Sequence, residues 1–423
     1  MEERFLTKNG VEIFGYRNPS QHGFFISLFL RSGSMYESDA ECGMTHFFEH
    51  VAIRNVNKQM NGRLYPDLDR LGVEFNATTY VEMVQFYTSG ASDKFSFAAR
   101  ALTHIFSPIT LSAEEIDAER RRIKAEIRED DKNSLSSFTN GIVHEKTSLS
   151  HSITGTLSNV GRINAKRLEE YRKRILTRDN AFFYVTGSFT DGDIAYLAEC
   201  IEKYNLAPSG SSHENIAPVS ANHFKRDGAV HVKNADFTVV RFTFDIDMKK
   251  HSVPVTDLLY DLLLTGYNSR LFMEMSETRG LFYDISGTLE RYRNIGELYF
   301  SYELRGKDIA EAVALTVDIL NSIKREAPGE EEMMRAGYVD NAGMLLDDSR
   351  ELNFTMAYDA HVMGLGYRSL EDRMEAYASV TPDDIKRAAC EIFTPENLIL
   401  TIKGNKKKIN AEELNSLIRG LKQ

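Results

Sequence analysis

Apolar and polar positions alternate with a helical period in the stretch Gly43–Val51. The stretch contains no proline and little β-branching, which favours a helix. At 100° per residue, His46, Glu49 and His50 share one narrow face. The opposite face is apolar, so we expect it to be buried and to hold the helix rigidly. The residues of this apolar face are Met44, Phe47, Phe48 and Val51.

The polar face carries two imidazoles one helical turn apart, His46 and His50, with a carboxylate, Glu49, between them. This spacing suits two ligands of a tetrahedral Zn²⁺ site, and the order H-x-x-E-H is the inverted zinc motif. An amphipathic helix with exposed histidines would give the same five letters. A catalytic zinc takes a third protein ligand, so a third ligand elsewhere in the chain would favour the metal site.

A second helix is predicted over residues 113–130, where Ser112 and Glu115 form a capping box at its start. Glu119 and Glu126 lie two turns apart along one flank of this helix, beside an apolar stripe. A carboxylate beside a buried stripe is costly unless it is paired or binds a metal, whereas a solvated charged helix needs neither. The stripe consists of Ile116, Ile123 and Ile127.

The two halves of the chain repeat a pattern of short buried strands. Residues 24–30 correspond to residues 238–244, and residues 178–187 correspond to residues 395–404. The sequence therefore predicts a duplicated α+β unit, with a mainly antiparallel sheet packed by helices in each copy. Opposite the histidine helix, the second copy has the apolar stretch 258–264 without histidine, so we expect the second copy to lack a metal site.

A polar, turn-rich stretch separates the two copies and predicts a domain boundary. We expect a first domain over residues 1–206, a linker over residues 207–222 and a second domain over residues 223–423. A chain of 423 residues is long for one domain, which supports the division.

Composition narrows the classes of function. The net charge is −11 and basic residues are not clustered apart from Lys406–Lys408, which we expect to be a solvated turn, so nucleic acid is disfavoured as a partner. The three cysteines are an odd number, widely spaced, and fit a reducing compartment rather than a disulfide framework. We read Cys42, close to the histidine helix, as a packing residue and not as a ligand. No apolar run reaches the length of a membrane span, and we see no signal peptide, so we expect a cytoplasmic protein.

The motifs together resemble the pitrilysin/insulinase family of zinc metallopeptidases. In addition to the H-x-x-E-H motif, the chain has Glu126 76 positions after His50 and Glu119 seven positions before Glu126. Further segments are similar to the family in the same order along the chain, so that the resemblance covers nearly all of it. These segments are Arg31–Glu37, Leu71–Thr79, Ser269–Phe272 and Arg279–Tyr283.

The resemblance implies one Zn²⁺ per chain, with His46, His50 and Glu126 as its ligands and one position left for water. Neutral imidazoles and a carboxylate suit this metal. Glu49 would then be the general base that holds the water and passes its proton to the leaving amine. Glu119 would orient a ligand histidine, although an ion pair with an arginine such as Arg122 is the competing role.

Substrate contacts are expected on the strand after Phe75. Asn76 would offer side-chain hydrogen bonds, and the small Ala77 would let an extended peptide approach the strand edge. Asn76 could equally be a turn residue that enters the strand. In its second half the family carries an Arg seven residues before a Tyr. Both side chains reach the region of the cleaved bond. Here the Tyr is Tyr283, which could also be a core aromatic, but the other position is Ser276.

The sequence therefore predicts a zinc endopeptidase that cleaves short or unfolded peptides inside a clam-shell chamber. The missing Arg favours a dimer, either a homodimer or a heterodimer with a paralogous subunit that supplies it. A non-catalytic scaffold or binding subunit of a family assembly is the alternative. The intact residues His46, Glu49, His50 and Glu126 argue against that alternative.

Overall fold

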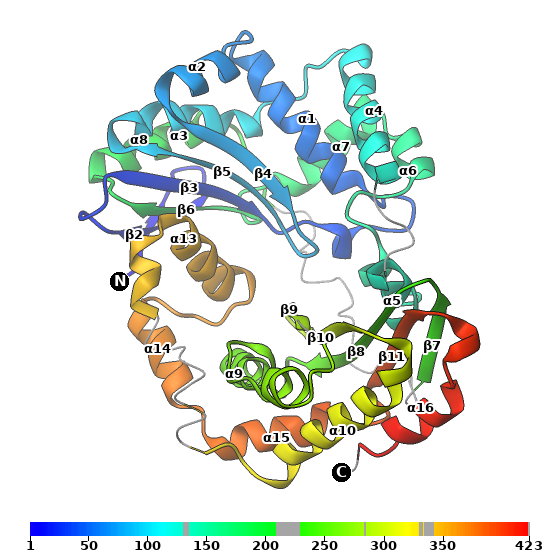
Figure 1. Ribbon diagram of the computed structural model, residues 1–423. Coiled ribbons are helices and arrows are strands. Elements are labelled where there is room, and N and C mark those ends of the chain that lie inside the picture. The colour runs from blue at the N-terminus through cyan, green and yellow to red at the C-terminus, as the bar shows by residue number, and fades with distance from the viewer. Residues whose placement is uncertain (130–134, 209–228, 283–284, 330–332, 334–341, 422–423) are drawn as a thin grey trace. The chain divides into compact units, whose positions relative to one another are not determined.

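The computed structural model describes residues 1–129, 135–208, 229–282, 285–329, 333 and 342–421. These residues form two compact units (Figure 1). Unit 1 comprises Met1–Asp131, Lys146–Ala217 and Gly343–Leu370, and unit 2 comprises Lys132–Glu145, Pro218–Ala342 and Glu371–Gln423. None of the described helices has an apolar stretch long enough to cross a membrane.

Unit 1 is built on a six-stranded sheet in the order β1-β2-β6-β3-β5-β4. Only β2 and β6 are parallel among its neighbouring strands, so the sheet is mainly antiparallel. β4 lies at one edge of this order and pairs with β5. The strands are β1 Glu3–Leu6, β2 Glu12–Arg17, β3 Gly23–Leu30, β4 Glu74–Thr79, β5 Val84–Ala91 and β6 Ala181–Gly187.

The side chains of β3 alternate between two apolar layers. Phe24, Ile26 and Leu28 join the core beneath most of the helices of unit 1, whereas Phe29 faces the other side of the sheet. Figure 1 shows the helical layer over one face. Its helices are α1 Met44–Gln59, α2 Leu64–Leu71, α3 Phe95–Thr103, α4 Ala113–Glu129, α6 Leu157–Arg162, α7 Ala165–Ile175 and α8 Asp191–Glu202.

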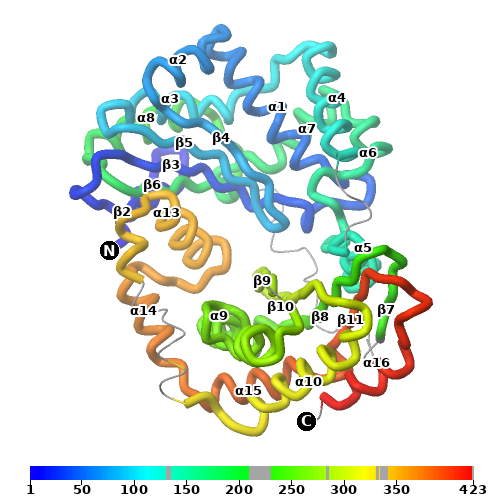
Figure 2. The backbone as a smooth tube through the Cα atoms, in the orientation of Figure 1, coloured from blue at the N-terminus to red at the C-terminus, as the bar shows by residue number. Residues whose placement is uncertain are grey.

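The other face of this sheet is covered by α13 (Ser349–Ala357), a helix from the second half of the chain. Its residue Asn353 is fully buried and donates to the carbonyl oxygen of Tyr184 at 2.9 Å, while it accepts from the hydroxyl of Ser27 at 2.7 Å. Figure 2 shows α13 beside β2 and β6. A buried, fully bonded amide fixes the position of this helix, because an unpaired one would be costly.

Unit 2 repeats the order β2-β6-β3-β5-β4 of unit 1 as a five-stranded sheet, β7-β11-β8-β10-β9, in which only β7 and β11 are parallel. The register repeats as well: Leu30 faces Ala181 in unit 1, and Phe244 faces Leu398 in unit 2. The predicted internal duplication and the two-domain α+β fold are therefore confirmed. The strands are β7 Ala229–Asn234, β8 Thr238–Asp247, β9 Ile285–Arg291, β10 Ile295–Leu304 and β11 Leu398–Gly404.

One helix of unit 2 comes from the first half of the chain. α5 (Leu135–Val143) packs on β11, where the hydroxyls of Thr139 and Thr401 are 2.7 Å apart. Leu400 points to the opposite face, into the core under the other helices. Each sheet thus carries a helix from the other half of the sequence. The remaining helices are α9 Val253–Leu264, α10 Ile309–Arg325, α14 Leu370–Ala378, α15 Pro382–Ile392 and α16 Ala411–Ile418.

The predicted division of the chain into two contiguous domains, 1–206 and 223–423, rests on the sequence similarity between its two halves. This division stays a prediction. The expected linker 207–222 lies, from residue 209 onward, outside the described residues.

Candidate metal centre

The helix that carries the two histidines, α1, begins at a backbone position that requires glycine. Gly43 has φ 89°, and a Cβ there would lie 2.7 Å from the Cα of Gly155. The carboxylate of Glu37 accepts the N–H groups of Gly43 and Thr45, both at 2.7 Å. These bonds satisfy two of the free donors at the helix start and place a negative charge at the positive end of the helix dipole.

Glu37 is a residue that the sequence reasoning did not single out, although it ends the segment Arg31–Glu37 that resembles the family. Its cap is formed across a loop rather than from the residue next to the helix. Burial raises the pKa of Glu37 to about 7, against the opposing effect of its bonds to Thr45 and Gly43. Only 4% of the residue is exposed.

This buried carboxyl gives a testable pH dependence. Because its folded pKa lies above the ordinary 4.5, its contribution to stability is present below about pH 4.5 and is lost as the pH rises to about 7. We expect wild type to lose up to about 3 kcal/mol relative to Glu37→Gln between pH 5 and pH 8. Urea unfolding of the metal-free proteins measures this difference, and a difference that stays constant with pH would contradict the cause given.

The apolar face of α1 is buried as predicted: Met44, Phe47, Phe48 and Val51 are at most 1% exposed. On the polar face, His46 and His50 turn toward α4, with which α1 is in contact. The capping box of α4 is also formed, since Ser112 N–H donates to Glu115 at 2.7 Å and Glu115 N–H donates to the Ser112 hydroxyl at 3.3 Å. Two helices from distant parts of the sequence thus present polar side chains to each other.

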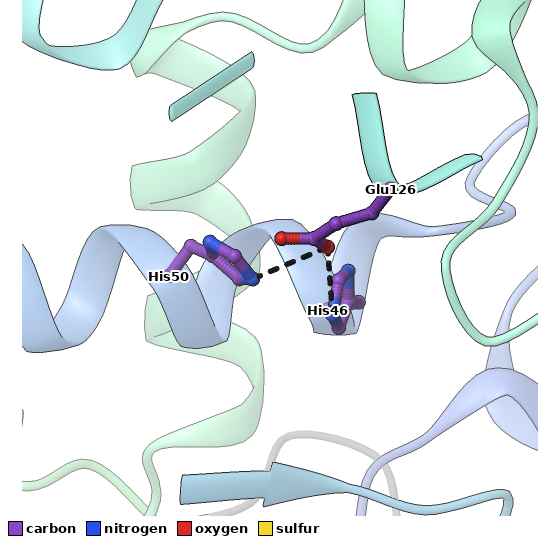
Figure 3. A group of neighbouring side chains, drawn as sticks. All are labelled: His46, His50 and Glu126. Atoms are coloured by element: carbon purple, nitrogen blue, oxygen red, sulfur yellow. Dashed lines mark ion pairs between the residues drawn. The ribbon is translucent and has the colours of Figure 1, made fainter. Parts of the chain in front are cut away.

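Glu126 of α4 reaches the two histidines of α1 (Figure 3). Its Oε2 lies 3.7 Å from the Nε2 of His46 and 3.7 Å from the Nε2 of His50. One ligand atom from each of the three residues lies within 4.8 Å of the others. The two 3.7 Å distances are longer than a hydrogen bond. They are near the ~3.3 Å expected between two ligand atoms that each lie about 2.05 Å from one tetrahedral ion.

The chemistry of the donors fits a zinc ion. Burial, with the neighbouring charge of His50, lowers the pKa of His46 to about 4, so its imidazole is neutral and free to bind a metal. In the described part of the chain the buried Nδ1 of His46 has no hydrogen-bond partner. Cys42 is not a competing ligand, because burial raises the pKa of its thiol to about 11 and the thiol donates to the carbonyl oxygen of Ser152.

Glu119 connects His50 to an arginine. Its Oε2 lies 3.5 Å from the Nδ1 of His50, and its Oε1 lies 2.5 Å from the Nη1 of Arg54. Burial raises the pKa of Glu119, but the bonds to His50 and Arg54, together with the charges of Arg122 and Arg54, hold the pKa below its ordinary value. Arg122, the arginine that the sequence suggested, is farther away at 3.5 Å from Oε1. Glu119 is therefore placed next to both a histidine and an arginine.

Glu49 faces the strand at the edge of the sheet. The hydroxyl of Thr79 on β4 donates to Glu49 Oε2. Burial raises the pKa of Glu49, and the hydrogen bond from Thr79 partly opposes that effect. Thr79, which the sequence reasoning missed as a contact, is the last residue of β4. On the same strand Asn76 is exposed, and its side-chain oxygen accepts the N–H of Ala77 at 2.9 Å.

Two family models match consecutive parts of the chain: "Insulinase (Peptidase family M16)" matches residues 15–159, and "Peptidase M16 inactive domain" matches residues 162–336. The chain belongs to peptidase family M16. Within the first match lie both helices of the candidate metal centre, α1 and α4.

Relatives and solved structures agree with this family. An "Uncharacterized zinc protease" of Rickettsia bellii is 25% identical over 413 residues, covering 93% of this chain and 96% of the relative. The bovine "Mitochondrial-processing peptidase subunit beta" is 26% identical over 196 residues, covering 46% of this chain and 39% of that protein. A crystal structure titled peptidase M16 inactive domain from Pseudomonas fluorescens superposes with a TM-score of 0.83 at 17% identity, covering 96% and 98% of the two chains.

The second half of this M16 chain lacks a counterpart of the histidine pair in α9. Tyr283 lies outside the described residues. Ser276, at the position where the family resemblance expects Arg, donates to the carbonyl oxygen of Phe282 at 2.9 Å. The nearby arginines are engaged elsewhere: Arg270 donates to the hydroxyl of Ser322 at 3.0 Å, and Arg279 lies 3.6 Å from Glu274.

Proposed function

We propose that this M16 protein is a zinc-dependent endopeptidase that cleaves short or unfolded peptides. The observation that carries the proposal is the convergence of His46, His50 and Glu126 on one point, beside the buried carboxylate of Glu49. The three side chains would be the metal ligands. When bound, the zinc lowers the pKa of a ligated water toward ~7 and polarises the scissile carbonyl.

Glu49 would act as the general base. Its Oε2 is held by the hydroxyl of Thr79, which fixes the carboxylate between α1 and β4. A base positioned in this way takes a proton from the attacking water and passes it to the leaving amine. Burial, which raises the pKa of Glu49, brings its proton affinity closer to that needed for both transfers.

Glu119 would position His50 through Nδ1. A histidine ligand binds metal in a fixed orientation when its second ring nitrogen donates to a carboxylate. Arg54 holds the other oxygen of Glu119, so the three residues form a chain from the ligand to the surface of α1.

The substrate would bind as an extended strand along β4. This strand pairs with β5 on one side only and stands at the end of the strand order. Main-chain bonds to a sheet edge give affinity for any extended peptide, whereas most segments of a folded protein already have their main-chain groups bonded elsewhere. Asn76 and Ala77 lie on this strand, and Thr79 connects it to the general base.

The chamber, the dimer and the cytoplasmic location are further parts of the proposal. The free, scattered cysteines support a reducing compartment. A partner subunit is supported by Ser276, which occupies the expected place of Arg, and by a relative that is itself named as a subunit. The partner, another copy or a paralogue, would supply the Arg and would enclose the peptide.

The partner requirement predicts a low activity of the isolated chain. We expect kcat/KM for an unstructured peptide to rise by about 10²-fold or more when a paralogous subunit with an intact Arg and Tyr is added, since a lost oxyanion donor typically costs that much. Peptide hydrolysis by the chain, measured as the purified partner is added in increasing amounts, gives the effect. A rate that no partner changes would remove this part of the proposal.

Hydrolysis of a quenched fluorescent peptide tests the function itself. Activity should vanish on chelation and return with one equivalent of zinc per chain. The alternative, a non-catalytic scaffold subunit, predicts neither turnover nor zinc uptake with or without a partner.

A further inference from the structure

A cavity of about 440 Å³ opens between α1, α2 and α4, next to the candidate metal centre. Its volume is in the range of sites that take a small ligand or a substrate side chain. Charged side chains dominate its wall, and all of them belong to unit 1. These side chains are Arg54, Lys58, Glu115, Glu119 and Arg122.

The two carboxylates of the cavity are already paired with two of its three cations. Lys58 Nζ lies 2.7 Å from Glu115, and Arg54 Nη1 lies 2.5 Å from Glu119. The third cation, Arg122, contacts Glu119 only at 3.5 Å, which is longer than a good hydrogen bond, and its side chain is 69% exposed. The cavity therefore has an excess positive charge with a loosely held guanidinium, although the chain as a whole has a net charge of −11.

The cavity is within reach of a peptide bound at the metal centre. Arg54 and Lys58 follow His50 by one and two turns of α1, or about 6 and 12 Å along the helix axis. An extended peptide advances about 3.3 Å per residue, so these distances correspond to two to four residues. Glu119 lies at the boundary, because one of its oxygens faces His50 and the other faces Arg54.

We infer that this cavity is a specificity subsite that binds a carboxylate of the peptide substrate, two to four residues from the cleaved bond, with Arg122 as the principal charge. The inference rests on the proposed peptidase function and adds a preference to it. A planar guanidinium binds a carboxylate in two parallel hydrogen bonds, which Lys cannot reproduce. The phenol of Tyr65, which also lines the cavity, is a further donor for the same group.

The matched variants are Arg122→Gln and Arg121→Gln. Arg121 is also exposed on α4 and does not line the cavity, so both changes remove one positive charge from the same helix. The substrates are a neutral peptide and versions with one Glu at each of four positions on either side of the cleaved bond, each with a free or an amidated C-terminus. The amidated peptides separate a side-chain carboxylate from the terminal one.

We expect wild type to prefer one of the acidic peptides over the neutral peptide. Arg122→Gln should reduce that ratio of kcat/KM by about five-fold, the size typical of one partly exposed ion pair, while Arg121→Gln leaves it unchanged. Any effect of Arg122 on the metal centre alters both peptides equally and cancels in the ratio. Arg122→Glu should reverse the preference toward a Lys-containing peptide.

Binding of the same peptides to the Glu49→Gln chain, followed by fluorescence anisotropy, tests the subsite without turnover. If the affinity ratio of acidic to neutral peptides is the same in Arg122→Gln as in its Arg122 parent, the subsite is refuted. If the ratio depends on Arg122 but wild type cleaves no peptide with or without a partner subunit, the carboxylate-binding site stands and the proposed peptidase function fails.

Discussion

Replacing Glu49 with Gln is expected to lower kcat/KM by about 10²- to 10⁴-fold while the zinc content stays near one per chain. Glutamine keeps the size of the side chain and can still accept the hydrogen bond from Thr79, but it cannot take a proton from water. Glu49 does not belong to the three residues whose ligand atoms converge, so the metal should remain. Peptide hydrolysis and elemental analysis of the same preparation measure both quantities.

Glu129→Gln is the matched control for this change. Glu129 is exposed in the last turn of α4, so its substitution removes the same charge at a position with no assigned role in metal binding or catalysis. The control should keep full activity. If Glu49→Gln retained more than about a tenth of wild-type activity, the assignment of Glu49 as general base would be wrong.

Replacing Glu126 with Ala is expected to abolish both zinc binding and peptide hydrolysis. The loss of affinity should exceed the 10- to 100-fold that removal of an outer partner costs, because Glu126 would contact the metal directly. Its side chain is 41% exposed, so truncation should disturb the packing of α4 little. Competition with a zinc-binding dye measures the affinity, and circular dichroism checks that the helices persist.

Here Glu129→Ala is the matched control, because it makes the same truncation three residues farther along α4. It should bind zinc as wild type does. Equal zinc affinity in Glu126→Ala and Glu129→Ala would exclude Glu126 as a ligand, and His46 and His50 would then have to bind the ion with some other third residue.

Much of the fold could be predicted because the patterns are local. The apolar face of α1 follows from helical spacing within a few residues, and the capping box at Ser112 marks the start of α4. The duplication could be read from two strand patterns, and the sheets repeat down to the opposed pairs Leu30 with Ala181 and Phe244 with Leu398. Such features require no knowledge of distant contacts.

The features that sequence reasoning missed depend on contacts that no local sequence pattern specifies. α13 covers the sheet of unit 1 through Asn353, although it follows that sheet's last strand by more than a hundred residues. Glu37 caps α1 across a loop, and Thr79 binds Glu49 from a strand. Neither contact has a fixed sequence spacing, so only coordinates reveal it.

Glu119 illustrates the same limit within the site. Sequence suggested Arg122 as its ionic partner, since the two residues lie on neighbouring turns of α4. The structure places Arg54 of α1 closer, at 2.5 Å against 3.5 Å. Helical spacing identifies neighbours on one helix, whereas packing between two helices decides which charge is nearer.

The most direct measurement of the central claim is X-ray absorption at the zinc edge on the chain loaded with one equivalent of zinc. Two helices that bring together His46, His50 and Glu126 predict a shell of nitrogen and oxygen atoms at about 2.0–2.2 Å, with two imidazoles and no sulfur. A sulfur ligand, a shell without imidazole, or a chain that takes up no zinc would contradict the account.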